Sequence, residues 1–397
     1  MPAGTAASPA LYRSTPLETA SGILCSGVRH DVPELPTVPP GLTPRAAMAA
    51  AMVPALERPP CVVSFSGGQD SSAVLAVAAD TARRHGLPPP MPVTLCFPDV
   101  ATAEESGFQE AVVRHLRLPD WERVVIGDEL DLVGPYATAV LRRHGHVWPF
   151  NAHFHVPIFE RATGGTVLTG AGGDELFWRR RWWRATMLLA RRRGPAPRDL
   201  LHLALALSPA PVRGLEMRLR TGFPADLPWL RPAARRAVVR AWYAEEARQP
   251  AAFDAAVRLT WWRSRSRLIL NATLAALAAD AGVAIGHPLE GPDFIAAVLA
   301  RRGAVGYQHR IEAMRDLFGD LLLPEVVERR DKARFDQGFW RHHSRGFAQR
   351  WDGHGVDPAL VDVDVLRAIW RRSEPVHVQT WPLFQTAWLA TDGAGLQ

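Results

Sequence analysis

A chain of 397 residues can bury a large core and has room for two or three domains. Its composition, 47% hydrophobic and 22% charged, is ordinary for a soluble globular protein, and no apolar run is long enough to span a membrane. The net charge is +6, but the 46 basic residues include a single lysine, so we interpret the excess as a solvated arginine surface and predict no nucleic-acid partner. No secretory signal is visible, and three scattered cysteines (Cys25, Cys61 and Cys96) predict neither disulfides nor zinc, so we expect a cytoplasmic protein.

Residues 1–45 are rich in proline, glycine, serine and threonine and predict an extended, partly disordered lead-in. One domain is expected over residues 46–397. Its first part, 46–178, alternates helical patterns at 44–56, 70–85 and 107–116 with strand-like runs at 61–65, 92–97, 122–126 and 166–169. Strand signals end near residue 179, and 179–397 is expected to be helical. The predicted fold class is α/β, a doubly wound parallel sheet followed by a largely helical C-terminal half.

The first chemical motif is the string S-G-G-Q-D-S-S at residues 66–72, between a strand and a helix. Glycines let the main chain approach a ligand, and the free N–H groups and dipole of a helix N-terminus attract an anion. Asp70 can hold a magnesium ion. The alternative is an ordinary helix cap after a tight turn. We predict a pyrophosphate-binding loop whose ligands are Ser66, Gly67, Gly68, Asp70, Ser71 and Ser72.

The second motif, T-G-A-G-G-D-E-L-F at residues 169–177, follows a strand about a hundred residues later. Its alternative interpretation is a glycine turn with a solvated acidic pair. The third feature is Lys332, the single lysine of the chain. Every other basic position in the chain is arginine, which indicates that arginine could not replace lysine at this position. The lysine ammonium is a compact charge, whereas the arginine guanidinium is a planar group with several donors. The alternative is a surface lysine.

These strings resemble a known family. The first is similar to the PP-loop of the ATP pyrophosphatases, which have an adenine nucleotide α-hydrolase-like fold and release pyrophosphate from ATP. The second resembles the S-G-x-G-x-D-E-[LV]-F signature of asparagine synthetases and β-lactam synthetases. The resemblance runs from about residue 46 to 340. It implies that ATP and Mg²⁺ are cofactors, that Asp174 and Asp70 are metal ligands, that Thr169 and Gly170 border the AMP, and that Leu95 and Phe97 belong to the ATP site.

The segment around Lys332 resembles the family's mobile loop, R-x-K-x-x-F, here near residues 329–340. The resemblance implies that Lys332 is catalytic and contacts the reaction centre. Charge placed at a developing oxyanion fits such a role.

Two departures from the family concern the acceptor. Met1 is followed by Pro2 where glutamine-using members have a cysteine, so we expect no glutaminase domain. Ala171 stands where asparagine synthetases have a glutamate and β-lactam synthetases a tyrosine, and it can accept no proton. Ala284 and Gly286 likewise replace the Glu and Arg of the family's G-V-E-A-R segment. We therefore expect that the ATP-binding part of the site matches the family and that the part that binds the acceptor substrate differs from it.

The predicted activity is that of an ATP-dependent carbon–nitrogen ligase, which adenylates a carboxylate for attack by an amine. Lasso-peptide cyclases belong to this family and close a peptide's side-chain carboxylate with its own N-terminal amine. Partners would then be a precursor peptide, a peptide-binding protein and a leader protease. The alternatives are an asparagine synthetase using free or supplied ammonia, another specialised amide ligase, a tRNA-modifying PP-loop enzyme and a non-catalytic scaffold.

Two further sequence patterns give weaker indications of function. The aromatic–basic segment 178–184 fits a peptide groove or, alternatively, helix core with solvated arginines. His153 and His155 are two positions apart and would diverge on a helix, so we assign them no metal. The carboxylate, the amine and the oligomeric state stay open.

Overall fold

A five-stranded parallel sheet lies at the centre of the fold in the order β3-β2-β1-β4-β5. The computed structural model describes residues 13–24, 27–103, 105–178, 180–191, 194, 196–220, 222–330, 335–374 and 377–394. In the register, Val63 of β1 faces Pro92 of β2 on one side and Leu168 of β4 on the other. The strands are β1 (Cys61–Ser64), β2 (Met91–Cys96), β3 (Glu122–Val125), β4 (Thr166–Leu168) and β5 (Ala284–Gly286).

Both faces of the sheet are covered by helices, which explains why β1 is buried in its first three residues and β4 throughout. Successive side chains of a strand point to opposite faces. Val62 packs into one hydrophobic core and Val63 into the other. The sheet is therefore doubly wound, and the predicted fold class is confirmed.

The core that contains Val63 is formed by α2 (Pro44–Leu56), α3 (Gln69–His85), α4 (Ser106–His115), α12 (Phe253–Ala256), α14 (Pro292–Arg302), α15 (Arg310–Phe318) and α16 (Pro324–Val327). The core that contains Val62 is formed by α5 (Pro135–His144), α6 (Val156–Glu160), α11 (Pro232–Arg248), α13 (Arg265–Asp280), α17 (His342–Arg350), α18 (Val363–Trp370) and α19 (Trp381–Ala394). The short helix α7 (Gly173–Phe177) follows β4. No helix in the described part of the chain is long and apolar enough to cross a membrane.

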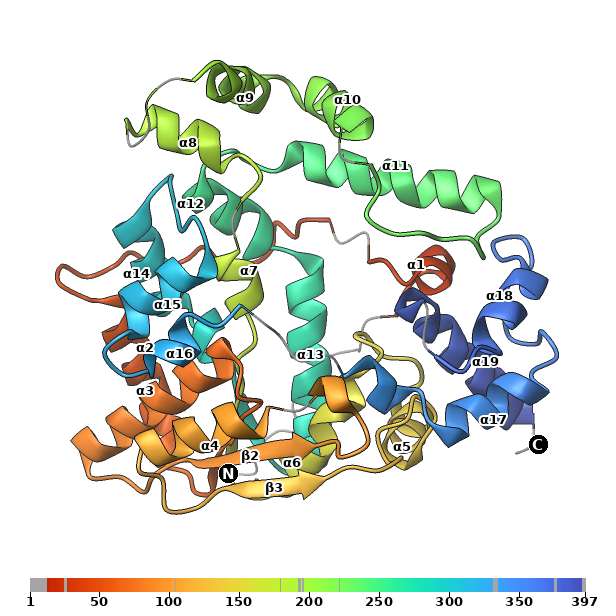
Figure 1. Ribbon diagram of the computed structural model, residues 1–397, viewed down its shortest axis with the longest axis horizontal. Helices are drawn as coiled ribbons and strands as arrows, with labels where there is room; N and C mark the ends of the chain where they lie inside the picture. Colours follow the sequence, from red (N-terminus) through yellow and green to blue (C-terminus); the bar gives the residue numbers. More distant parts are fainter. Residues whose placement is uncertain are drawn as a thin grey trace, which may run out of the picture.

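Figure 1 shows three helices, α8 (Trp183–Leu189), α9 (Pro197–Leu207) and α10 (Ala210–Arg220), at the edge of the molecule farthest from β2 and β3. We call residues 183–220 the outer arm. α8 contacts α9, and α10 contacts α11, which connects the arm to the rest of the helical half.

The structure corrects two expectations. The helical half contains a strand, β5, whose three half-buried residues pair with β4 at the sheet edge. A strand this short, which itself ends in a glycine, gives no alternating pattern, so it was not predicted. The lead-in is also not wholly extended, because α1 (Pro16–Ser21) lies within it. Thr15 and Glu18 form a capping box there, and Arg265 pairs with Glu18 at 2.5 Å.

Candidate active site

The two glycine-rich motifs meet at the switch point of the sheet. β1 and β4 are neighbours, whereas the chain leaves β1 toward β2 and returns to β4 on the opposite side. The connections therefore diverge at the carboxyl ends of these two strands, where open α/β sheets bind their ligands. The 66–72 loop follows β1 and the 169–173 loop follows β4.

The loop after β1 is held by its own serines. The Ser66 N–H donates to Ser71 Oγ at 3.2 Å, and the Gly68 N–H donates to Ser66 Oγ at 3.3 Å. Gln109 from α4 donates to the Ser66 carbonyl at 2.9 Å. Gly68 is the N-cap of α3 and provides no side-chain cap, so the N-terminus of this 17-residue helix keeps N–H groups for an anion.

The loop after β4 is shaped by close contacts that only glycine permits. Gly172 has a φ of +93°, and a Cβ there would lie 2.4 Å from Glu290 Cγ. Glu290 is buried and accepts from Asn271 at 2.7 Å and from Arg267 at 3.3 Å. Burial raises the pKa of Glu290, although the contacts with Asn271 and Arg267 act to lower it. This buried group fixes the position at which α7 begins.

Arg310 joins the two carboxylates that sequence analysis assigned to magnesium. Its guanidinium pairs with Asp70 through Nη2 and donates to Asp174 Oδ1 through Nη1 at 2.6 Å. Burial lowers the pKa of Arg310 to about 10. Asp70 and Asp174 therefore lie within the span of one guanidinium, although they are on different helices.

These residues suit a magnesium ion bound to pyrophosphate. Hard oxygen donors from two loops are what Mg²⁺ prefers, and it usually has few protein ligands besides phosphate oxygens. Oδ1 of Asp70 is buried without a hydrogen-bond partner among the described residues, and a cation would satisfy it. No cluster of three or more metal-ligating side chains occurs in the described part of the chain.

A cavity of about 1210 Å³ opens over both loops. Seven of the predicted site residues line it: Ser66, Gly68, Asp70, Ser71, Thr169, Gly170 and Asp174. Gly67, Ser72, Leu95 and Phe97 are not among its described lining residues, and Ser72 is fully buried. Phe97 packs on Phe335 with ring centroids 5.6 Å apart. Its contact with the site thus runs through Phe335, which lies in the predicted catalytic loop and lines the cavity.

Lys332, together with residues 331–334, lies outside the described residues, but the segment before it is tied to the first motif. Gln69 donates through Nε2 to the carbonyls of Val327 at 2.7 Å and Arg329 at 3.2 Å. Arg329 forms a buried ion pair with Glu105 and donates to the Gly67 carbonyl at 3.4 Å. Arg330, the last described residue before the gap, lines the cavity.

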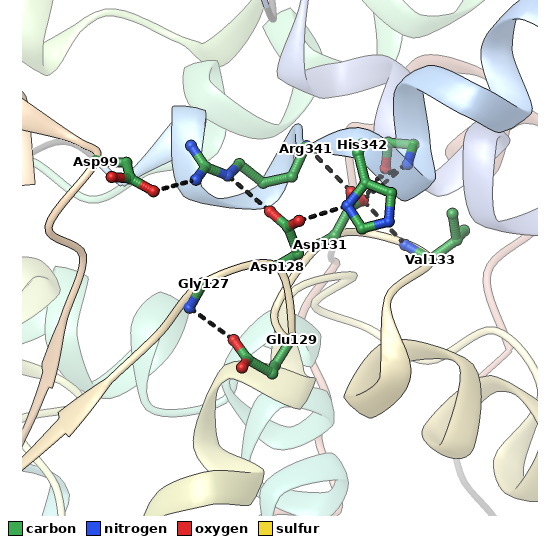
Figure 2. Close-up of polar contacts among 9 residues, drawn as sticks. Asp99, Gly127, Asp128, Glu129, Asp131, Val133, Arg341 and His342 are labelled. Carbon is green, nitrogen blue, oxygen red and sulfur yellow. Dashed lines mark hydrogen bonds and ion pairs between the residues drawn. The ribbon is translucent and has the colours of Figure 1, made fainter.

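The segment after Lys332 is anchored to the loop that follows β3 (Figure 2). Arg341 donates from Nε to Asp128 at 3.0 Å and from Nη2 to Asp99 at 2.8 Å, and His342 also contacts Asp128. The main-chain N–H of Arg341 donates to Asp131 at 3.1 Å. Both ends of the predicted catalytic loop are therefore anchored by contacts with other parts of the fold.

Two buried histidines lie at or next to the cavity. His155 lines it, as does Ala171, and Nδ1 of His155 is buried without a partner in the described structure. Nδ1 of His287 lies 2.7 Å from Thr169 Oγ1. Burial lowers the pKa of each imidazole to about 4, so both are neutral at pH 7. His153 diverges from His155 and bonds the Leu130 carbonyl at 3.0 Å.

Sequence reasoning missed Arg310, Glu290 and the position of His155. Arg310 is 136 residues from Asp174 in the chain, so no local spacing connects them. Glu290 could have been noticed as an acidic residue in the apolar P-L-E-G-P string at residues 288–292. Its role in holding the glycine loop is visible only in three dimensions.

Comparison with known proteins agrees with this geometry. The family model described as Asparagine synthase matches residues 45–390. No curated protein matches the chain.

Proposed function

Because the chain belongs to the asparagine synthase family of ATP-dependent, AMP-forming carbon–nitrogen ligases, we propose that it adenylates a side-chain carboxylate of a peptide and joins it to that peptide's N-terminal amine. Such an enzyme is a lasso-peptide macrocyclase. Its partners would include the precursor peptide, a peptide-binding protein and a leader protease.

The proposed reaction has two steps. A carboxylate oxygen attacks the α-phosphorus of ATP, the α–β bridge bond breaks, and pyrophosphate leaves. The amine nitrogen then attacks the acyl carbon of the adenylate, AMP leaves with the bonding pair, and the nitrogen loses a proton.

The chain's own residues have distinct tasks in this proposal. The N-terminus of α3 and the hydroxyls of Ser66 and Ser71 bind the phosphates that become pyrophosphate. Asp70 and Asp174 would hold magnesium, which neutralises phosphate charge when bound. Lys332 is proposed to stabilise charge at the activated carboxylate.

The observation that supports a peptide substrate is the character of the cavity. Its volume of about 1210 Å³ exceeds the usual range for small-molecule sites, which is roughly 300–1,000 Å³. The charged lining residues accompany the two phosphate-side loops and the segment before Lys332. A second part of the described lining carries no charge at pH 7, and it is formed by Asn151, Phe154, His155, Ala171, Trp178, Leu270, Leu274 and Phe339. Free aspartate carries an ammonium and a second carboxylate that would need charged partners, whereas a peptide bond needs none.

We also propose that His155 accepts the proton of the attacking amine. Ala171 has no group that could do so, and the unpartnered Nδ1 of His155 belongs to a neutral imidazole in the same cavity. Phe159 stacks on this ring at 5.9 Å between centroids and holds its orientation.

The test supplies ATP and Mg²⁺ with one of two substrate sets. One is aspartate with ammonium, and the other is a linear peptide with a free N-terminus and an internal glutamate or aspartate. We expect AMP release and loss of one water from the peptide, without formation of asparagine. The N-acetylated peptide is the matched control, because it keeps the carboxylate but cannot close. Asparagine production at a rate equal to or above peptide closure would contradict the proposal.

The His155 proposal has its own measurement. His155→Leu should slow amide formation about a hundredfold, within the usual range for acid–base groups, while leaving ATP–pyrophosphate exchange nearly unchanged. Equal losses in both assays would show that His155 supports the fold or adenylation instead.

A further inference from the structure

The two outer helices of the arm expose apolar side chains in stripes. On α9 the exposed residues Leu200, Ala204 and Leu207 follow i, i+4 and i+7, and on α10 Val212, Leu215 and Leu219 follow i, i+3 and i+7, which places each set on one helix face. Leu201 is exposed beside the first stripe, and these leucine and valine side chains are between 47% and 77% exposed. On the same two helices Ala206 and Met217 are buried, and Ala206 packs with Trp182 and Ala185.

Both stripes lie on the outer side of the molecule. α9 is supported by α8, and α10 is supported by α11, so the faces opposite these contacts are the exposed ones. Figure 1 shows α9 and α10 beside one another at the periphery, with α8 and α11 between them and the body. Leu189 at the end of α8 is also exposed. Exposed apolar residues gathered in this way indicate an interaction surface.

The surface around the stripes is positively charged. From residue 179 to 220 the sequence has eleven arginines and only two acidic residues. Both acids are engaged from the inner side, Asp199 by Arg184 at 3.4 Å and Glu216 by Arg181 at 2.7 Å. Arg198, Arg218 and Arg220 are exposed beside the stripes. A second copy docked on this face would bring like charges together, which disfavours self-association.

We propose that the outer arm binds the surface of an anionic lipid bilayer. Aliphatic side chains on one face of a short helix, flanked by arginines, enter the boundary between headgroups and acyl chains while the guanidinium groups contact lipid phosphates. The arginine stems can reach outward from the helix sides to do so. Two 11-residue helices are too short to span the hydrocarbon core, so the arm lies on the membrane.

The experiment is co-sedimentation of the full chain with vesicles. Vesicles of phosphatidylcholine alone are compared with vesicles that also contain phosphatidylglycerol, at low and high salt. We expect binding to the anionic vesicles, weakened by salt, and little binding to the neutral ones. The triple variant Leu207→Gln, Leu215→Gln, Leu219→Gln keeps every charge and should bind at least about tenfold more weakly, because each exposed leucine loses its apolar transfer free energy.

The matched control is Val125→Gln, a 67% exposed residue on β3, at the other side of the molecule from the arm. It should bind like the wild type, and thermal melts should show both variants folded. Equal vesicle binding by the triple variant, or no binding by the wild type at low salt, would overturn the proposal. A dimer detected by light scattering that the triple variant abolishes would assign the surface to a second copy and also overturn it.

Discussion

The carboxylate of Asp131 accepts hydrogen bonds from the main-chain N–H of Ser344, a residue 213 positions later, at 3.0 and 3.2 Å. The Ser344 hydroxyl contacts the same carboxylate, and both residues are fully buried. This contact holds the first turn of α17 against the loop after β3. It therefore determines where the chain leaves the predicted catalytic loop.

Ser344→Ala should lower the free energy of unfolding by about 1–3 kcal/mol, because a buried carboxylate loses one of its donors. Urea denaturation measures this. Ser266→Ala is the control, since Ser266 is exposed, its hydroxyl bonds the Ser264 hydroxyl at 3.3 Å, and its loss should cost less than about 0.5 kcal/mol. Equal midpoints for the two variants would show that the contact contributes nothing.

Gly173→Ala should slow adenylation about a hundredfold by displacing a proposed metal ligand. A Cβ at this position would lie 2.3 Å from Cγ of Asp70, so the carboxylate must move. A shift of about 1 Å in an active site can cost about a hundredfold in rate. Gly107→Ala on α4 meets no atom within 4 Å and is the control. ATP–pyrophosphate exchange above a tenth of the wild-type rate in Gly173→Ala would contradict the assignment of Asp70.

Arg310→Gln should strengthen the binding of Mg²⁺ to the nucleotide-free protein. The guanidinium and the metal compete for Asp70 and Asp174, and a hydrogen bond to a charged group contributes about 1.5–3 kcal/mol, or about ten- to a hundredfold. Arg315→Gln, whose exposed side chain pairs with Glu328 at 3.0 Å, is the control. Titration calorimetry gives the affinities. Weaker Mg²⁺ binding in Arg310→Gln would show that the arginine holds the carboxylates in place for the metal.

Acidification should destabilise the fold before the carboxylates titrate. Burial lowers the pKa of His146, His153, His155 and His287 to about 4, whereas the unfolded imidazole has a pKa of 6.5. Between these values the unfolded chain binds a proton and the folded chain does not. Stability is therefore present above pH 6.5 and is lost as the pH falls toward 4, by about 1.4 kcal/mol per pH unit for each histidine.

Urea midpoints at a series of pH values check this slope. His155→Leu should reduce the slope of the unfolding free energy against pH by the contribution of one histidine, about 1.4 kcal/mol per pH unit. His85→Gln, which replaces an exposed histidine, is the control. A slope unchanged by His155→Leu would mean that this imidazole is protonated in the folded protein.

The sequence predicted the parts of the site that depend on neighbouring residues. A strand, a glycine loop and a helix start follow one another directly at residues 61–72, so the loop that lines the cavity was predicted from one string. Arg310 was not, because it meets Asp174 only after the helical half folds onto the sheet. β5 was missed because its pairing with β4 comes from the tertiary fold and not from a strand pattern.

Lys332 remains a prediction, and a pair of substitutions tests it. If its ammonium stabilises charge at the activated carboxylate, Lys332→Arg should be almost as damaging as Lys332→Ala, because the wider planar guanidinium cannot occupy the place of a compact ammonium. The expected loss is on the order of 2.7–4 kcal/mol, or about a hundred- to a thousandfold in rate. Nucleotide affinity should change less, since the loop at residues 66–72 and the N-terminus of α3 are proposed to bind most of the phosphate groups.

The segments on either side of Lys332 are held in place independently of this residue. Arg329 on one side and Ser344 on the other have buried partners of their own, so replacing Lys332 should leave both ends of the loop in place. Single-turnover rates are compared with nucleotide affinities, and exposed Arg345→Ala on α17 is the control. If Lys332 is a surface lysine, both variants should turn over at rates near the wild type, and Lys332→Arg should be the milder of the two. Near-normal turnover in that variant would remove Lys332 from the reaction centre.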